Sequence, residues 1–281
     1  MSAIEVQSLR KVYGDVVAVD GVSFEVASGE CLALLGPNGA GKTTTTEVLE
    51  GYRRPDSGTA RVLGVDSTAG GLDWRARLGI VLQADRDLGD LTVREAVTHF
   101  ARYFPNPRDP EEVIESVGLT EKAKARSAKL SGGQRRRLDV ALGIIGRPEV
   151  LFLDEPTTGF DPAARREFWG LISQIKDEGT TILLTTHYLE EAEKLADRVA
   201  VIARGRIVDI DTPTRIGGRA DGQAVVTWSE GGVRQTAETT QPTQFVIELS
   251  TRLGGEIPEL QVHHPTLEET YLALLKAQED L

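Results

Sequence analysis

The sequence has little of several features that would each indicate a particular class of protein. It contains one cysteine, Cys31, which excludes an intramolecular disulfide framework and fits a reducing compartment. No run approaches the roughly 18 apolar residues that cross a bilayer, and residues 1–10 are polar, without the apolar region of a signal peptide. We therefore expect a cytoplasmic chain with no membrane span of its own.

Basic residues are also scarce relative to acidic ones. The chain has 32 Lys and Arg against 43 Asp and Glu, a net charge of −11. Such an acidic balance disfavours a nucleic-acid coat or an anionic-lipid binder, so no nucleic-acid partner is expected. The 281 residues are 40% hydrophobic and 27% charged, which is typical of a globular protein with a sizeable core.

Short runs rich in Val, Ile and Leu alternate with helical patterns along most of the chain. Runs that are apolar on both faces and alternate with helices indicate parallel strands buried under helices, an α/β fold. The predicted strands are residues 22–26, 31–35, 79–82, 150–153, 181–185 and 198–203. The predicted helices are residues 43–50, 92–103, 110–117, 131–145, 162–178 and 189–196.

The composition changes at residues 211–223, where Asp, Thr, Pro, Gly and Arg predominate. Turn signals in this stretch predict a boundary between a large domain, residues 1–211, and a small α+β appendage, residues 212–281. Within the appendage we predict two strands and an amphipathic helix, at residues 224–228, 244–249 and 265–277.

A glycine-rich stretch directly follows the predicted strand 31–35. It satisfies the pattern G-x-x-x-x-G-K-[ST] with Gly36, Pro37, Asn38, Gly39, Ala40, Gly41, Lys42 and Thr43. Glycines let backbone N–H groups wrap a phosphate, while Lys42 reaches the β and γ oxygens and Thr43 offers a hydroxyl to Mg²⁺. With Thr44, these residues predict a site for a Mg-nucleoside triphosphate. The alternative is a glycine-rich turn with an exposed lysine.

Two carboxylates follow the apolar run 150–153. Asp154 and Glu155 would lie at the carboxyl end of a buried strand, the edge at which such sheets bind ligands. We predict that Asp154 belongs to the Mg²⁺ shell and that Glu155 polarises an attacking water. The alternative is a pair of solvated loop carboxylates. No Asn-Lys-x-Asp loop for guanine occurs, so adenine is favoured.

A third motif, Leu130 followed by Ser131, Gly132, Gly133 and Gln134, lies between these two. With it, the chain resembles the ATP-binding cassette ATPases, whose signature is this five-residue string. In isolation the string is explained equally well as a capped helix start. The resemblance covers residues 4–211 and implies a P-loop nucleotide-binding domain with a helical signature region at about residues 84–147.

Four further positions match the family pattern one by one. The resemblance implies that Tyr13 stacks on adenine, that Gln83 is the Q-loop glutamine near the metal, that Asp161 is the D-loop aspartate and that His187 is the switch histidine. Three of them have an ordinary alternative: a strand aromatic for Tyr13, a surface amide for Gln83 and a capped loop histidine for His187.

Eight basic residues and two acidic ones lie between Glu121 and Arg147, a local excess of positive charge. Arg135, Arg136 and Arg137 follow the signature directly. They could steer a triphosphate towards it, or they could form a solvated helix face.

In the cassette family two domains close face to face, so that ATP on the phosphate loop of one is completed by the signature of the other. This chain has one cassette. The resemblance therefore implies a homodimer, or pairing with a homologous cassette, and a separate membrane permease that holds the chain at the cytoplasmic face of the membrane.

Three stretches, residues 50–58, 187–193 and 265–272, resemble the drug and antibiotic exporter ATPases of the daunorubicin-resistance type. They imply ATP hydrolysis that powers efflux of a drug, antibiotic or lipid-like molecule. Phe160, where leucine is usual, and the charged residues 85–90 depart from the pattern. An importer-type ATPase is one alternative. The other is a soluble ATP switch acting on ribosomes or DNA, whose relatives usually carry two cassettes or long coiled insertions.

Overall fold

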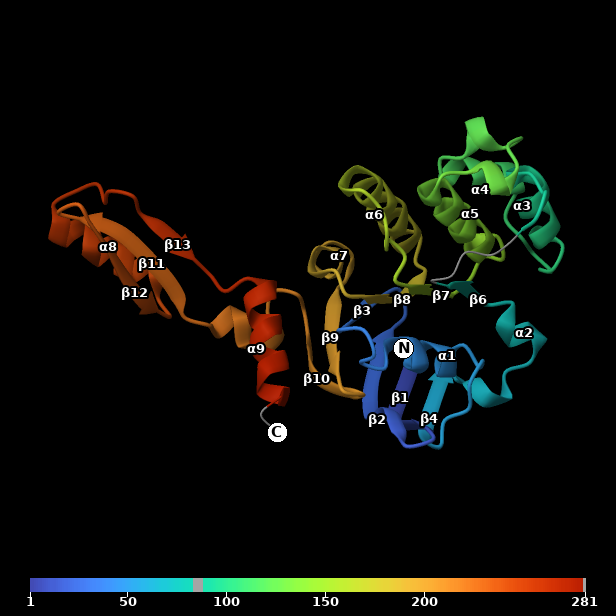
Figure 1. Cartoon of the computed structure of the whole chain (residues 1–281), viewed down its shortest axis with the longest axis horizontal. Coiled ribbons are helices and arrows are strands. Elements are labelled where there is room, and N and C mark those ends of the chain that lie inside the picture. The colour runs from blue at the N-terminus through green and yellow to red at the C-terminus, as the bar shows by residue number, and fades with distance from the viewer. Residues whose placement is uncertain (83–87, 280–281) are drawn as a thin grey trace. The chain divides into compact units, whose positions relative to one another are not determined.

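A computed structural model describes residues 1–82 and 88–279, so the predicted Gln83 lies outside the described residues. The chain divides into two compact units, Met1–Ile210 and Asp211–Leu281 (Figure 1). Each unit is described by itself below. None of the helices in the described part of the chain has the length and apolar character that a bilayer span requires.

A six-stranded sheet forms the centre of the first unit, in the order β10-β9-β3-β8-β7-β6. Its strands are β3 (Cys31–Leu35), β6 (Leu78–Val81), β7 (Val150–Asp154), β8 (Thr181–Thr186), β9 (Arg198–Ala203) and β10 (Arg206–Asp211). Strands β9, β3, β8, β7 and β6 pair in parallel, and every residue of β3, β7 and β8 is buried. The predicted α/β fold is confirmed. Because these strands are parallel, their carboxyl ends meet at one edge.

Helices follow three strands of this sheet, as expected of a parallel arrangement: α1 (Lys42–Leu49) follows β3, α6 (Pro162–Asp177) follows β7 and α7 (Leu189–Leu195) follows β8. A short helix, α2 (Leu72–Arg75), precedes β6. Asp161 caps α6, since its Oδ1 accepts hydrogen bonds from the backbone N–H groups of Ala163 and Ala164, both at 2.9 Å, and Pro162 occupies the first turn. Strong start signals thus fix where the helix after β7 begins.

A second sheet of the first unit is antiparallel, in the order β2-β1-β4-β5. It consists of β1 (Ser2–Tyr13), β2 (Val16–Ala27), β4 (Ser57–Val62) and β5 (Val65–Asp66). The prediction that residues 22–26 form a parallel strand buried on both faces is wrong, because they belong to β2, which pairs antiparallel with β1. Val22, Phe24 and Val26 are buried while the residues between them are exposed, the alternation of a strand with one solvated face.

The described residues 88–149, between β6 and β7, are mainly helical. They contain α3 (Val93–Ala101), α4 (Pro110–Ser116) and α5 (Gly132–Ile144), and α3 and α4 both contact α5. Thr92 and Glu95 form a capping box at the start of α3, and Asp109 caps α4. These capping side chains explain why α3 and α4 begin directly after Thr92 and Asp109.

The second unit contains a three-stranded antiparallel sheet in the order β12-β11-β13. Its elements are β11 (Ala224–Glu230), β12 (Val233–Thr239), β13 (Gln261–His263), α8 (Pro242–Leu253) and α9 (Leu267–Glu279). The predicted strand at residues 244–249 is wrong, because these residues lie in α8. Leu249 packs with Val226 and Trp228 of β11, and Pro242 opens the helix, so that burial of one helical face decides the structure of this apolar run.

Candidate active site

The phosphate loop connects β3 to α1 through a backbone that only glycine can adopt at two positions. Gly41 has a φ of 102°, and a Cβ there would lie 2.4 Å from the carbonyl oxygen of Ala18. A Cβ on Gly36 would lie 2.3 Å from the carbonyl oxygen of Ile202. Both glycines are therefore required by close backbone approach. The loop ends at the amino terminus of α1, whose N–H groups and dipole favour an anion.

Lys42 begins α1 and folds back over this loop. Its Nζ donates hydrogen bonds to the carbonyl oxygens of Gly36, at 2.8 Å, and Pro37, at 3.2 Å. The side chain is only 4% exposed, and Nζ also forms an ion pair with Oε1 of Glu155 at 3.1 Å. The ammonium group is thus held against the backbone carbonyls of the loop, and the alternative of an exposed lysine on a turn does not apply.

Asp154 ends β7 next to the phosphate loop. The hydroxyl of Thr43 lies 3.3 Å and 3.4 Å from its two carboxylate oxygens, and the hydroxyl of Thr185 donates to Oδ1. Asp154 is 6% exposed. The two predicted metal ligands that the structure describes, one hydroxyl and one carboxylate, therefore lie together at the carboxyl edge of the sheet, which suits a hard cation that is otherwise held by phosphate and water.

The side chain of Glu155 contacts both Lys42, next to the phosphate loop, and His187, which follows β8. Its Oε2 lies 3.1 Å from Nδ1 of His187, while its Oε1 pairs with Lys42. The carboxylate is 9% exposed, so the alternative of a solvated loop carboxylate does not apply. The backbone of Glu155 is left-handed, with a φ of 44°, a conformation that costs a residue with a side chain about 1–3 kcal/mol.

The signature residues begin α5 with a capping box. The hydroxyl of Ser131 accepts a hydrogen bond from the backbone N–H of Gln134 at 3.3 Å, and Oε1 of Gln134 accepts one from the N–H of Ser131 at 3.1 Å. A hollow of about 500 Å³ is lined by Ser131, Gly132 and Gly133, together with Glu155 and Asp161. Among the described residues that line it, none comes from the phosphate loop.

Tyr13 ends β1 and is 38% exposed. The guanidinium of Arg53 and the ammonium of Lys11 lie 5.3 Å and 5.5 Å from its ring centroid. Among the described residues, the cations beside its ring are thus Lys11 and Arg53 rather than Lys42.

Two buried charged residues near the site were not singled out correctly from the sequence. Glu191 of α7 is fully buried and accepts hydrogen bonds from the hydroxyl of Thr157, at 2.9 Å, and from Nε1 of Trp169, at 3.3 Å. Burial raises the pKa of its carboxyl. Arg136, for which a solvated helix face was one prediction, is 5% exposed, and that prediction is wrong for it.

Glu50 follows α1 and is 9% exposed. Burial, and then the charges of Asp154 and Glu47, raise the pKa of its carboxyl to about 7. The folded protein therefore binds a proton at Glu50 more tightly than the unfolded chain does, for which the ordinary value is 4.5. The contribution of Glu50 to the free energy of unfolding is therefore fully present below pH 4.5 and is lost as the pH rises through 7.

We expect Glu50→Gln to stabilise the protein at pH 8 by about 3 kcal/mol, because it removes a buried charge. At pH 5 the wild-type side chain is largely protonated in the folded state, so the gain should be about 1 kcal/mol or less. Urea denaturation in the presence of EDTA, without nucleotide, measures both values. An equal gain at the two pH values would contradict the assignment.

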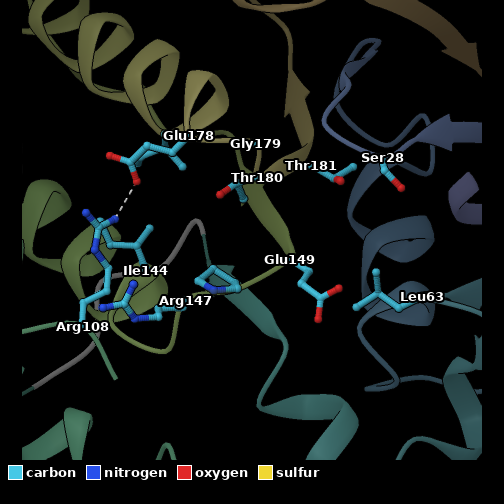
Figure 2. Close-up of a pocket in the computed structure, with 12 residues that line it drawn as sticks. Ser28, Leu63, Arg108, Ile144, Arg147, Glu149, Glu178, Gly179, Thr180 and Thr181 are labelled. Atoms are coloured by element: carbon cyan, nitrogen blue, oxygen red, sulfur yellow. Dashed lines mark hydrogen bonds and ion pairs between the residues drawn. The ribbon is translucent and has the colours of Figure 1, made fainter. Parts of the chain in front are cut away.

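The pocket in Figure 2 lies elsewhere in the first unit. It has a volume of about 400 Å³ and is lined by Glu149, which precedes β7, and by Thr181, which begins β8. Arg108 and Glu178 form an ion pair at 2.9 Å on its wall. Because it lies at the amino ends of these strands, it brings none of the predicted site residues together.

A fully buried parallel strand, a glycine loop and a lysine folded over the loop carbonyls define a nucleotide-binding protein of the P-loop class. Comparisons with known proteins specify it further. Residues 19–158 match the family model of the ABC transporter. The Nod factor export ATP-binding protein I of Paraburkholderia xenovorans is 45% identical over 76% of this chain and 72% of its own length. That of Sinorhizobium fredii is 42% identical over 88% and 74%.

Solved structures share the fold. CbiO1 from Clostridium perfringens, part of the ABC transporter complex CbiONQ, superposes with a TM-score of 0.70 at 28% identity, over 76% of this chain and 90% of its own. An ATP-binding subunit of an ABC transporter superposes with a TM-score of 0.72 at 22% identity, over 97% and 99%. The chain belongs to the ABC transporter family. It is the ATP-hydrolysing subunit of an ABC exporter, and the predictions of an ATPase and of ATP as nucleotide are confirmed.

Proposed function

We propose that this chain drives export of a drug, antibiotic or lipid-like molecule through a separate permease, at the cytoplasmic face of the membrane. The observation that carries the chemistry is the cluster in which Glu155 lies 3.1 Å from both Lys42 and His187, beside the phosphate loop. The curated relatives named for Nod factor export support export of an organic molecule rather than import.

In the proposed reaction, the loop from Gly36 to Gly41 and the start of α1 hold the β- and γ-phosphates through backbone N–H groups. Lys42 neutralises their charge. Glu155 accepts a proton from the water that attacks the γ-phosphate in line, and His187, on the other oxygen of that carboxylate, orients the water or the γ-phosphate. Tyr13 stacks on the adenine. Gln83, which follows β6 in the sequence, helps to organise the Mg-ATP.

The residues at the carboxyl edge fit Mg²⁺. Thr43 and Asp154 would hold the ion, with Gln83 as the third predicted ligand, because hydroxyl and carboxylate oxygens are ligands that suit Mg²⁺ and those of Thr43 and Asp154 lie within 3.4 Å of each other. When bound, Mg²⁺ neutralises charge on the β- and γ-phosphates. No group of three or more His, Cys, Asp and Glu side chains forms a metal cage within residues 1–82 and 88–279.

The proposal also covers organisation. Residues 1–211 serve as the nucleotide-binding domain, with the helical signature region at about residues 84–147, and residues 212–281 serve as an accessory domain. Two chains, or this chain and a homologous cassette, close so that Ser131 to Gln134 and Asp161 of one meet the phosphate loop of the other. In the described part of the chain, the hollow beside Ser131 includes no phosphate-loop residue, which supports a site completed from outside.

The test is purification of the tagged chain from native membranes in mild detergent. We expect a multi-spanning membrane protein to co-purify, and the reconstituted complex to hydrolyse ATP and move cargo out of the nucleotide-bearing compartment. The Glu155→Gln chain, which we expect to keep the fold because glutamine has nearly the same size, is the matched control for transport. A complex that moves cargo only in the opposite direction, or a chain that purifies with ribosomes, would overturn the proposal.

A further inference from the structure

Arg136, on the signature helix α5, binds three backbone carbonyls at the carboxyl ends of strands β6 and β7. Its Nε donates a hydrogen bond to the carbonyl oxygen of Pro156 at 2.9 Å, and its Nη2 donates to that of Asp154 at 2.8 Å. Its Nη1 donates to the carbonyl oxygen of Leu82, the residue after β6. The side chain is 5% exposed, and its bonds to Pro156 and Asp154 are buried.

Two of the three carbonyls flank Glu155. This residue has a left-handed backbone, which persists only where its surroundings hold it. The backbone N–H of Glu155 donates to the carbonyl oxygen of Thr185 at 3.1 Å and to its hydroxyl at 3.0 Å. Arg136 binds the carbonyl before Glu155 and the carbonyl after it. Residue 155 is thus fixed by its own amide and by one guanidinium on both sides.

The fork of a guanidinium suits this task. Its N–H groups lie in one plane at fixed angles, so one side chain can bind several carbonyls whose relative positions are then set. A lysine ammonium in the same place is a point charge on a flexible stem and cannot impose that geometry. Arg136 is also one turn from Ser131, so the fork links the start of α5 to the backbone of Glu155.

We propose that Arg136 is a positioning residue for ATP hydrolysis, which holds the backbone of Glu155 so that its carboxylate faces the phosphate loop. The inference rests on the proposed role of Glu155 as base. Arg136 acts through Glu155, and the three carbonyls that it binds lie outside the phosphate loop. We therefore expect its loss to lower turnover more than it weakens nucleotide binding.

The experiment compares Arg136→Lys with Arg137→Lys in the full chain. Arg137 is the matched control, because it is the next residue of α5 and makes its bonds to Val117 and Glu167, away from Glu155. We expect Arg136→Lys to lower kcat about tenfold or more, with the Kd of a fluorescent ATP analogue unchanged within about twofold. Arg137→Lys should change neither. An unchanged kcat, or a Kd weakened as much as kcat falls, would overturn the proposal.

A double-mutant cycle separates this inference from the proposed function. If Arg136 acts through Glu155, Arg136→Lys should have little further effect on turnover in the Glu155→Gln background. Multiplied effects would overturn the positioning role and leave the base assignment standing, whereas normal turnover by Glu155→Gln alone would overturn the base assignment itself.

Arg136→Gln is the second variant, since it keeps two N–H donors without the charge. Circular dichroism and thermal denaturation accompany each kinetic measurement. If both variants of Arg136 unfold, the residue is structural only and the proposal fails. Folded variants with lowered kcat and retained ATP affinity support it.

Discussion

Replacing Glu155 with glutamine is expected to lower ATP turnover by about 10²-fold or more while ATP still binds. The amide keeps the size of the side chain and its reach to Lys42 and His187, but it cannot accept a proton from water at neutral pH. Loss of the negative charge also removes the competitor for the Lys42 ammonium, so the affinity for ATP should be equal or higher. Steady-state hydrolysis and equilibrium binding of a fluorescent ATP analogue measure the two effects.

The control for this variant is Glu190→Gln on α7. That carboxylate lies in a side chain that is 75% exposed and 3.9 Å from Arg165, so the same chemical change is made away from the cluster. It should leave turnover within about twofold, as is usual for surface substitutions. Near-normal turnover by Glu155→Gln would remove Glu155 from the role of base.

The second large effect is complementation between two inactive chains. Lys42→Ala loses the phosphate-loop ammonium, and Ser131→Arg fills the start of α5 with bulk. If each site lay within one chain, every mixture would stay inactive. In a shared-site homodimer, the mixed dimer pairs the intact loop of one variant with the intact signature of the other. We therefore expect partial recovery of hydrolysis when the two variants are mixed.

Dimer formation is measured separately from hydrolysis. If both sites of a dimer had to be intact for hydrolysis, a mixed dimer with one intact site would form without recovering ATPase activity. Chains with two different affinity tags, both carrying Glu155→Gln to slow hydrolysis, should co-purify only when ATP is present. Failure to form any ATP-dependent mixed dimer would disprove self-pairing and leave a different cassette as the partner.

The parallel strands and the phosphate loop could be predicted because their signals are local. A strand buried on both faces is apolar throughout, and Gly36 to Thr43 must follow such a strand directly for the loop to work. Residues 22–26 were misassigned although their alternation of buried and exposed side chains is visible in the sequence. Residues 244–249 could not be assigned by period, because a six-residue stretch with four apolar residues suits a strand or a helix face equally.

Buried charges were the hardest part of the site to predict. The residues next to Glu50 and Glu191 in the sequence do not indicate that these side chains are buried, because their burial depends on packing between segments far apart in the sequence. Helical spacing does not separate Arg136 from its two neighbours either. The residues four and seven positions after Arg135, Arg136 and Arg137 are all buried in α5, so the sequence pattern alone does not indicate which arginine points inward.

The ion pair between Lys42 and Glu155 has a consequence for the proposed reaction. One ammonium group cannot fully neutralise a carboxylate and a triphosphate at the same time. In the proposed reaction, a nucleotide that binds the loop would compete with Glu155 for Lys42 and would thereby free the proposed base to accept a proton. After phosphate leaves, Glu155 would pair with Lys42 again and oppose rebinding of the product. On this proposal, one contact would couple nucleotide binding to the availability of the base and to product release.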